Sequence, residues 1–388
     1  MDQQLVNIMF SLVRYELGDC GPLLNEERIF VSNNIESLYK LSKAHDLSHI
    51  VWDSLTKQGI TVEESEWSRK FEKERLLAMF RYERINYEFC ELCSIFEEEK
   101  IPFIPLKGAV IRNYYPQPWM RTSCDIDILV NEEDLEKAVN VLKTKMEYKE
   151  ESGRNHHDLS LYSPNGVHLE LHFSIMGHIE SVNSLLSKAW DHAVLVDGKN
   201  YQHKYTNEYF VFYHIAHMAN HFINGGCGIK PFLDLLLIKR HIQFDSETVM
   251  KMCESCGLQK FYGSVLDLSK VWFENYEYSD ITLDMQSFIL FGGVYGNMKN
   301  GIAVKQSKRG GKWSYIRSRI FLNKKSLTNY YPILNKKAWL MPFCQVHRWF
   351  KIFVGGRFKR SINEIKVNSS ISNEQTEQTR IFLNSIGL

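Results

Sequence analysis

Proline, glycine and long apolar runs are all scarce in this sequence. Only 9 Pro and 22 Gly occur among 388 residues, which excludes collagen-like and low-complexity chains. No window of ~18 uninterrupted apolar residues is present, so no membrane span is expected. The richest late stretch, 338–356, contains His347, Arg348 and Lys351. The first residues include acidic side chains and lack a small-residue cleavage site, so we do not expect a signal peptide.

Cysteine accounts for 8 of the 388 residues. Eight Cys without a secretion signal predict reduced thiols in a cytoplasmic protein. Two C-x-x-C pairs occur, Cys90 with Cys93 and Cys253 with Cys256, and they formally supply four zinc ligands. Both pairs lie in helical patterns without Gly-rich knuckles, so a zinc site is not favoured.

Acidic residues are absent from one long segment. Residues 285–360 contain 16 Lys and Arg and no Asp or Glu, whereas residues 1–284 contain 29 basic and 43 acidic residues. The overall net charge of +1 conceals this asymmetry. Such a segment attracts phosphate-rich ligands or anionic surfaces, or it packs on the acidic remainder. Trp313 and Tyr315 lie among its cations, which suits single-stranded nucleic acid, a clamp for base and triphosphate, or a structural core.

Apolar residues are plentiful elsewhere, at 44% of the chain, so a large core and two or three structural units are expected. The periodicity predicts an α+β fold, in which a small mixed sheet is flanked by N-terminal and C-terminal helical regions. We divide the chain into 1–100, an N-terminal helical region; 101–178, an α/β core; 179–284, a helical domain; 285–360, a basic, aromatic-rich region; and 361–388, a polar tail expected to be loose.

The α/β core is read from short patterns. IPFIPL, with Pro at its second and fifth positions, is typical of an edge strand, and it leads through Lys107-Gly108 into a short helix over AVIRNYY. DIDILV is a β-branched strand, after which Asn131 can cap a helix. LSLYS and VHLELHF, separated by the turn Pro-Asn-Gly, indicate a hairpin.

Carboxylates cluster on two of these strands. Because alternate residues of a strand point to one face, Asp125 and Asp127 lie side by side, and Glu170 shares a face with His168 and His172. If the strands are neighbours, three carboxylates converge, which is costly unless a cation holds them. Oxygen ligands suit Mg²⁺ or Mn²⁺, and two such ions could bind a triphosphate for in-line displacement. The alternative is a solvated strand edge.

The preceding segment offers groups for phosphate. Lys107 and the Gly108 backbone lie at a turn before a helix, where N–H groups favour an anion. Arg121 and Ser123 add a guanidinium and a hydroxyl just before the carboxylates. These four residues are therefore candidate phosphate contacts, and the resemblance described next assigns them to nucleotide binding.

The run LKGAVIRNYYPQPWMRTSCDIDILV, followed by VHLELHF, resembles the uncharacterised nucleotidyltransferase family of the polymerase-β-type nucleotidyltransferase superfamily. That superfamily has a Gly-Gly or Gly-Ser turn, a D-x-D strand and a third carboxylate, which match Lys107-Gly108, Asp125 with Asp127, and Glu170. The resemblance extends to KAHDLSHIVWDSL, HIAHMANH, KPFLDLLLI and GGVYG. The turn here reads Lys-Gly-Ala, so the hydroxyl of a Gly-Ser turn is missing.

The resemblance implies transfer of an NMP from an NTP to an unknown acceptor hydroxyl or phosphate, with Asp125, Asp127 and Glu170 binding Mg²⁺ or Mn²⁺ and acting in catalysis. The acceptor could be a small molecule, a peptide, a protein or an RNA. The alternative is a non-catalytic module that binds nucleotide or RNA through 285–360.

Histidines form a further pattern. His214, His217 and His221 occupy one helix face. This face is interpreted as a metal site, a phosphate-contacting face or a set of hydrogen-bonded core histidines. We list these three, with His157 and His172, as possible substrate-lining residues.

Overall fold

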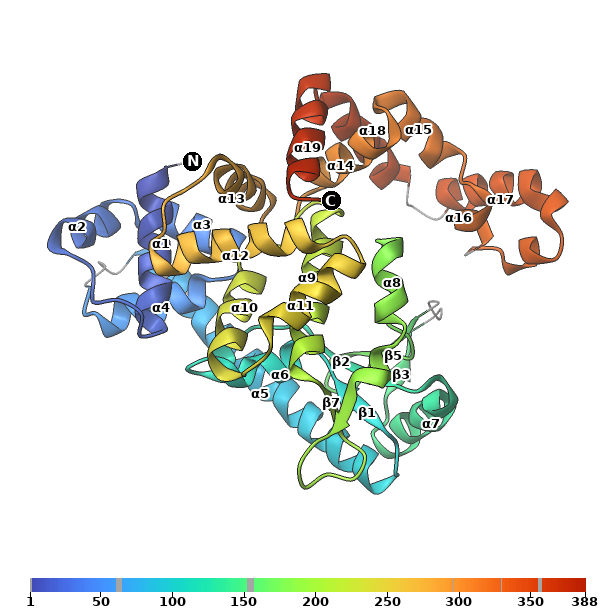
Figure 1. The fold of residues 1–388 in the computed structure, drawn as a ribbon, viewed down its shortest axis with the longest axis horizontal. Coiled ribbons are helices and arrows are strands. Elements are labelled where there is room, and N and C mark those ends of the chain that lie inside the picture. The colour runs from blue at the N-terminus through green and yellow to red at the C-terminus, as the bar shows by residue number, and fades with distance from the viewer. Residues whose placement is uncertain (1, 61–64, 152–156, 295, 329, 355–357) are drawn as a thin grey trace. The chain divides into compact units, whose positions relative to one another are not determined.

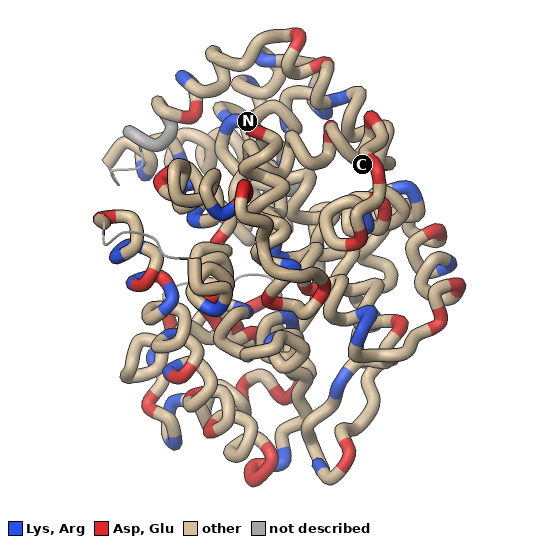
Figure 2. Tube along the Cα trace, turned by 90° about the vertical axis from the view of Figure 1, so that its left-hand side faces the viewer, with Lys and Arg blue, Asp and Glu red and all other residues tan. Residues whose placement is uncertain are grey.

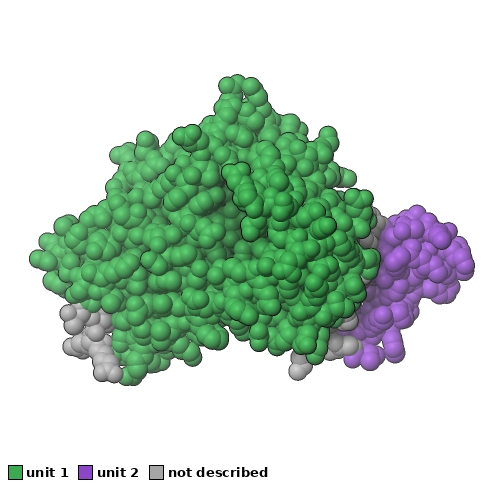
Figure 3. All heavy atoms as spheres, turned by 90° about the horizontal axis from the view of Figure 1, so that it is seen from below, with its two compact units in different colours: residues 1–220, 229–282 green, residues 221–228, 283–388 purple. Residues whose placement is uncertain are grey.

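The structure, a computed structural model, describes residues 2–60, 65–151, 157–294, 296–328, 330–354 and 358–388. They form two compact units, shown in different colours in Figure 3. Unit 1 comprises residues 1–220 and 229–282, and unit 2 comprises 221–228 and 283–388. The five regions drawn from the sequence stay a proposal about organisation, because compactness joins the first three, apart from 221–228 and 283–284, and joins the last two.

Unit 1 begins with helices, as the sequence predicts for 1–100 (Figure 1). The last of them is the longest, and Ser65 caps its start by accepting from the Ser68 N–H. The five helices are α1 (Gln3–Glu16), α2 (Asn25–Asn33), α3 (Ile35–Ala44), α4 (Ser48–Lys57) and α5 (Glu66–Glu98).

A five-stranded mixed sheet follows, with the order β1-β2-β5-β4-β3. Its strands are β1 (Phe103–Pro105), β2 (Asp125–Val130), β3 (Lys149–Glu150), β4 (Asp158–Tyr162) and β5 (His168–His172). β1 lies at the sheet edge and β4 pairs with β5 as a hairpin, both as predicted. β2 and β5 are parallel neighbours, so the condition for converging carboxylates is met. The α+β class with a mixed sheet and flanking helices is confirmed.

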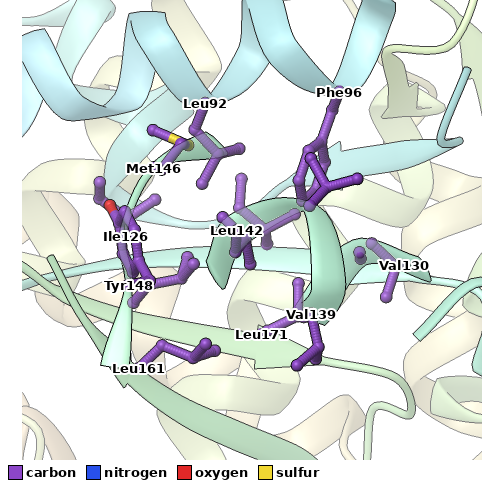
Figure 4. Close-up of a cluster of buried hydrophobic side chains, with 14 of the residues drawn as sticks. Leu92, Phe96, Ile126, Val130, Val139, Leu142, Met146, Tyr148, Leu161 and Leu171 are labelled. Atoms are coloured by element: carbon purple, nitrogen blue, oxygen red, sulfur yellow. The ribbon is translucent and has the colours of Figure 1, made fainter. Parts of the chain in front are cut away.

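One face of the sheet is apolar and covered by two helices. Ile126 and Leu171 point from β2 and β5 toward Leu92 of α5 and Leu142 of α7 (Leu135–Lys145), as Figure 4 shows. All four side chains are nearly inaccessible to solvent. Strand alternation therefore directs the polar residues of β2 and β5 to the opposite face.

Short helical elements connect the strands: α6 (Gly108–Ile111) and the 3₁₀ turns η1 (Arg112–Tyr114), η2 (Pro118–Met120) and η3 (Glu132–Asp134). The expected cap at Asn131 is not formed, because its amide donates to Asp134 and accepts no backbone N–H.

The region 179–284 is mostly helical, with one exception. It contains α8 (Glu180–Leu186), η4 (Ala189–His192), α9 (Asn207–Phe222), α10 (Lys230–His241), α11 (Ser246–Ser255), α12 (Gln259–Glu274) and the first residues of α13 (Asp280–Gly292), which continues into unit 2. The exception is a two-stranded ribbon of β6 (Ala193–Leu195) and β7 (His203–Tyr205), which the helical prediction missed. These strands are too short to show a period, although Asp197-Gly198, with φ of 73° at Gly198, is a turn signal.

Unit 2 contains α14 (Met298–Arg309), α15 (Lys312–Ile320), α16 (Lys324–Thr328), η5 (Pro332–Asn335), η6 (Ala338–Leu340), α17 (Met341–Val354), α18 (Phe358–Ser370) and α19 (Asn373–Ser385). The expectation of a loose tail over 361–388 is wrong, because α19 is capped by Ser372 and buries Phe382 and Leu383. Figure 2 marks the charged residues along the chain. Among the described residues, no helix is long and apolar enough to cross a membrane.

Candidate active site

The polar face of the sheet gathers the predicted carboxylates. Parallel pairing places Asp125 opposite His168 and Asp127 opposite Glu170. One ligand atom each of Asp127, Glu170 and His172 lies within 4.8 Å of the others, and the same holds for Asp125, His168 and Glu170. Glu170 belongs to both groups, so the three carboxylates form one cluster.

Asp127 is the most enclosed of these carboxylates, at 5% exposed. Its Oδ1 accepts from Lys107 Nζ and from His172 Nε2, each at 3.0 Å. Burial alone would raise the pKa of Asp127, but the charges and hydrogen bonds of Lys107 and His172 hold it well below its usual range. Asp127 is therefore an anion at every physiological pH.

Asp125 behaves in the opposite way. Burial, and then the negative charge of Asp127, raise the pKa of Asp125 above its ordinary value, and Glu170 adds to the repulsion. Lys107 opposes that rise. The cluster thus holds more negative charge than its neighbouring cations neutralise, which is the electrostatic condition for a bound cation.

The donor set fits a divalent ion. Three carboxylates provide the hard oxygen ligands that Mg²⁺ and Mn²⁺ prefer, and two imidazoles lie in the same groups. The buried Nε2 atom of His168 has no hydrogen-bond partner. None of the eight cysteines enters a candidate metal group formed by the described residues.

Lys107 adopts an unusual backbone conformation. Its φ of 43° and ψ of −116° lie where a side chain other than Gly costs about 1–3 kcal/mol. This strained turn delivers Nζ to Asp127. Burial disfavours the charged ammonium, but Asp127 and the other two carboxylates outweigh that effect and raise the pKa of Lys107. At Gly108 a Cβ would lie 3.2 Å from Arg121 Nη1, so the next position has little room for a side chain.

Arg121 was assigned to nucleotide binding, and the structure gives its guanidinium another partner. Nε and Nη2 donate to the two carboxylate oxygens of Asp234 at 3.1 and 2.8 Å, and Nη1 donates to the Thr122 carbonyl. Asp234 is fully buried in α10 and also accepts from the Tyr115 hydroxyl. Arg121 therefore fixes the chain ahead of β2.

Ser123 is engaged in a similar way. Its hydroxyl accepts from Arg112 Nη2 at 3.0 Å and donates to the Asp125 carbonyl. Arg112 is 3% exposed, and its Nε donates to the Gly108 carbonyl. Burial, and then the charge of Arg121, lower the pKa of Arg112 to about 10. Arg112, which sequence reasoning missed, ties the Gly108 turn to the start of β2.

Two helical sequence blocks whose roles could not be predicted locally both contact the segment before β2. Lys230 of α10 donates to Asp46 at 2.5 Å and to the Thr122 hydroxyl at 2.7 Å. His49 Nε2 contacts the Met120 carbonyl at 2.8 Å. The helical blocks KAHDLSH and KPFLDLLLI therefore hold the backbone that leads into β2.

A pocket of about 180 Å³ opens beside the carboxylates. Of the predicted lining residues, His157, His172 and His217 border it, together with Lys107 and Glu170. Residues that were not predicted also line it, notably Tyr213 and Asn220 of α9. Their positions follow from the helical period once His217 is known to face the pocket.

His214 and His221 are not among the residues that line this pocket. His214 is buried, and its Nε2 contacts the Pro231 carbonyl at 2.8 Å. His221 lies at the end of α9, in the part of the helix that belongs to unit 2. The predicted three-histidine face is thus divided between different surroundings.

Replacing His172 by Gln is expected to make stability less sensitive to pH. Burial disfavours His172 protonation, but hydrogen bonds to Asp127 and Glu170 outweigh it and raise its pKa. Protonation of His172 therefore stabilises the folded state. This contribution is fully present below about pH 6.5, which is the pKa of His in the unfolded chain, and is lost as pH rises through the pKa of His172 in the folded protein. In EDTA, the melting temperature of wild type should exceed that of the variant most at pH 5.5 and least at pH 8.5. Equal differences at both values would contradict this assignment.

Replacing Lys107 by Met should lower the stability of the metal-free protein by about 2 kcal/mol, because the carboxylates lose their nearest ammonium. Mg²⁺ or Mn²⁺ should then raise the melting temperature of the variant more than that of wild type. Lys143→Met breaks an exposed ion pair with Glu150 and serves as the control, with an expected loss of less than about 1 kcal/mol. Differential scanning calorimetry, with EDTA and with metal, measures both.

The site lies in a region that matches a known protein family. A family model described as "Uncharacterised nucleotidyltransferase" matches residues 32–274, which include the whole carboxylate cluster, the Lys107 turn and the α10 residues that position them. No curated relative and no solved structure matches the chain. The matched region covers more than half of the 388 residues, and the chain therefore belongs to this family of uncharacterised nucleotidyltransferases.

Proposed function

We propose that the chain is a metal-dependent enzyme that transfers an NMP from an NTP to an acceptor hydroxyl or phosphate. Nucleotidyl transfer as such follows from the family, which also implies an NTP donor. The observation that carries the finer proposal is the convergence of Asp125, Asp127 and Glu170 on one sheet face, with Lys107 against Asp127.

Asp125, Asp127 and Glu170 would hold Mg²⁺ or Mn²⁺. The bound ions supply charge neutralisation at the triphosphate and polarise the phosphate under attack. Lys107 and the backbone N–H of Gly108 contact the donor phosphates, with the ammonium shared between phosphate and Asp127. Arg121 and Ser123, first assigned to the same task, act by positioning that turn and the start of β2.

The pocket beside Glu170 suits the reacting end of an acceptor. Its volume of about 180 Å³ is below the range of roughly 300–1,000 Å³ that encloses a drug-sized ligand, so it does not enclose a whole nucleotide. An acceptor hydroxyl placed there attacks the α-phosphorus and loses its proton to Glu170. One P–O bond forms, the bond to the bridging oxygen breaks, and pyrophosphate leaves.

The experiment is calorimetric titration of ATP, GTP, CTP and UTP with Mg²⁺. Wild type should bind at least one nucleotide, and Asp127→Ala should abolish that binding. Glu133→Ala removes the same charge from an exposed position beyond the other end of β2, and it should bind as wild type does. Metal-independent binding, or binding that survives Asp127→Ala, would contradict the proposed site.

The alternative remains a module that binds nucleotide or RNA through 285–360 without turnover. In unit 2, a second pocket of about 1150 Å³ includes Lys305, Arg319, Arg348 and Lys351 in its lining, with three tyrosines, and this is the observation in its favour. It predicts steeply salt-dependent RNA binding and no metal-dependent product.

A further inference from the structure

Helix α17, which precedes the two C-terminal helices α18 and α19, is apolar on most of its circumference. Ten of the fourteen residues in MPFCQVHRWFKIFV are apolar. One side of α17 is used within unit 2: Cys344 joins a small core with Leu327 and Leu334. Two of its four polar residues also turn inward, since Gln345 Nε2 donates to the Leu322 carbonyl at 2.6 Å and Arg348 Nη2 to the Ile320 carbonyl at 2.7 Å, whereas His347 and Lys351 are exposed.

The opposite side of α17 carries a stripe of exposed apolar side chains. Phe343, Val346, Phe350 and Val354 are 66%, 59%, 64% and 70% exposed. Their spacing of i, i+3, i+7 and i+11 places them on one helix face. Trp339, 69% exposed, extends the stripe and contacts the Phe343 ring edge to face.

The surroundings of this stripe are cationic. Lys336 and Lys337 are exposed immediately before Trp339, and Lys351 is exposed on α17 itself. No Asp or Glu occurs anywhere between residues 285 and 360. A second copy of the same surface would bring like charges together, so self-association through this face is disfavoured.

We propose that α17 is a membrane-surface helix, which lies in the interface of an anionic lipid bilayer with Phe343, Val346, Phe350 and Val354 inserted among the acyl chains. An apolar face with aromatic residues, flanked by lysines and without acidic residues, is the pattern of helices that bind anionic lipid surfaces. With fourteen residues, α17 is too short to cross the hydrocarbon core, which needs about 20. Lys336, Lys337 and Lys351 lie where headgroup phosphates would meet them. This inference is independent of the proposed catalytic site.

The test is flotation of the full-length protein with vesicles of phosphatidylcholine, with and without about one third phosphatidylglycerol. Wild type should float with the anionic vesicles only, and less at high salt. Phe350→Ser should weaken the apparent affinity at least about tenfold. Lys336→Gln and Lys337→Gln should each weaken it about fivefold. The matched control is Phe80→Ser, which removes a phenyl ring that is 63% exposed on α5 and should float as wild type does.

Three results would overturn the proposal. The first is absence of wild-type flotation, and the second is equal flotation of wild type and Phe350→Ser. The third is a face used for something else: a wild-type dimer in sedimentation that Phe350→Ser dissociates, or single-stranded RNA binding that is lost in this variant while vesicles are not bound. The melting curve of each variant should match that of wild type, because the altered side chains are exposed. Lys351→Gln removes a charge from α17 itself and serves as a further charge variant.

Discussion

Replacing Asp127 by Asn is expected to reduce nucleotidyl transfer by about a thousandfold or more. The substitution keeps the side-chain shape but removes the negative charge that Lys107 and His172 both contact. Without this charge, the remaining carboxylates neutralise the charge of a divalent ion less completely. Lys107 also loses the partner that holds its ammonium at the turn. The measurement is pyrophosphate released from the NTP that wild type binds, in an acceptor-containing extract at saturating Mg²⁺.

The control for this prediction is Glu133→Gln, the same chemical change at an exposed position beyond the far end of β2. It should retain wild-type turnover. Retention of more than a tenth of the activity by Asp127→Asn would show that this carboxylate does not serve the chemistry, whatever its role in stability.

The largest effect on stability is expected at Asp234. Replacing it by Ala leaves the buried Arg121 guanidinium and the Tyr115 hydroxyl without their acceptor, which should cost about 3–5 kcal/mol. Complete burial alone would raise the pKa of Asp234, but the charge and hydrogen bonds of Arg121 stabilise its ionised form more strongly, so the pKa of Asp234 is lowered. Urea unfolding of the metal-free protein measures the loss.

A matched control for Asp234 is Asp267→Ala, which breaks an exposed pair with Lys270 at 3.6 Å and should change stability by less than about 1 kcal/mol. If Arg121 instead served the nucleotide directly, Asp234→Ala would leave unfolding nearly unchanged and raise the KM for the NTP. The two readouts therefore separate positioning from phosphate contact.

The sheet and its carboxylates were predictable because their information is local. Period-two alternation in DIDILV and VHLELHF assigns faces without knowledge of the rest of the chain, and the Pro-Asn-Gly turn indicates the hairpin. That the two strands are neighbours had to be assumed, and the structure supplies both this and their parallel pairing. Glu170 then falls opposite Asp127 by register alone.

The partners of Arg121 and Thr122 were not predictable, because they come from residues far along the chain. Asp234 lies 113 positions from Arg121, and Lys230 lies 108 positions from Thr122. A single charged residue within a helical pattern has the same local appearance whether it is solvated or buried in an ion pair. The histidine face shows the same limit, since the period places three rings together but does not show which element each one meets.

The most direct test of the proposed site is anomalous diffraction at the manganese edge, from crystals grown with Mn²⁺ and a non-hydrolysable form of the NTP that binds. The account predicts an anomalous peak in contact with Asp125, Asp127 and Glu170, with the triphosphate next to Lys107. A bound nucleotide whose metal and phosphates lie away from these three carboxylates would contradict it.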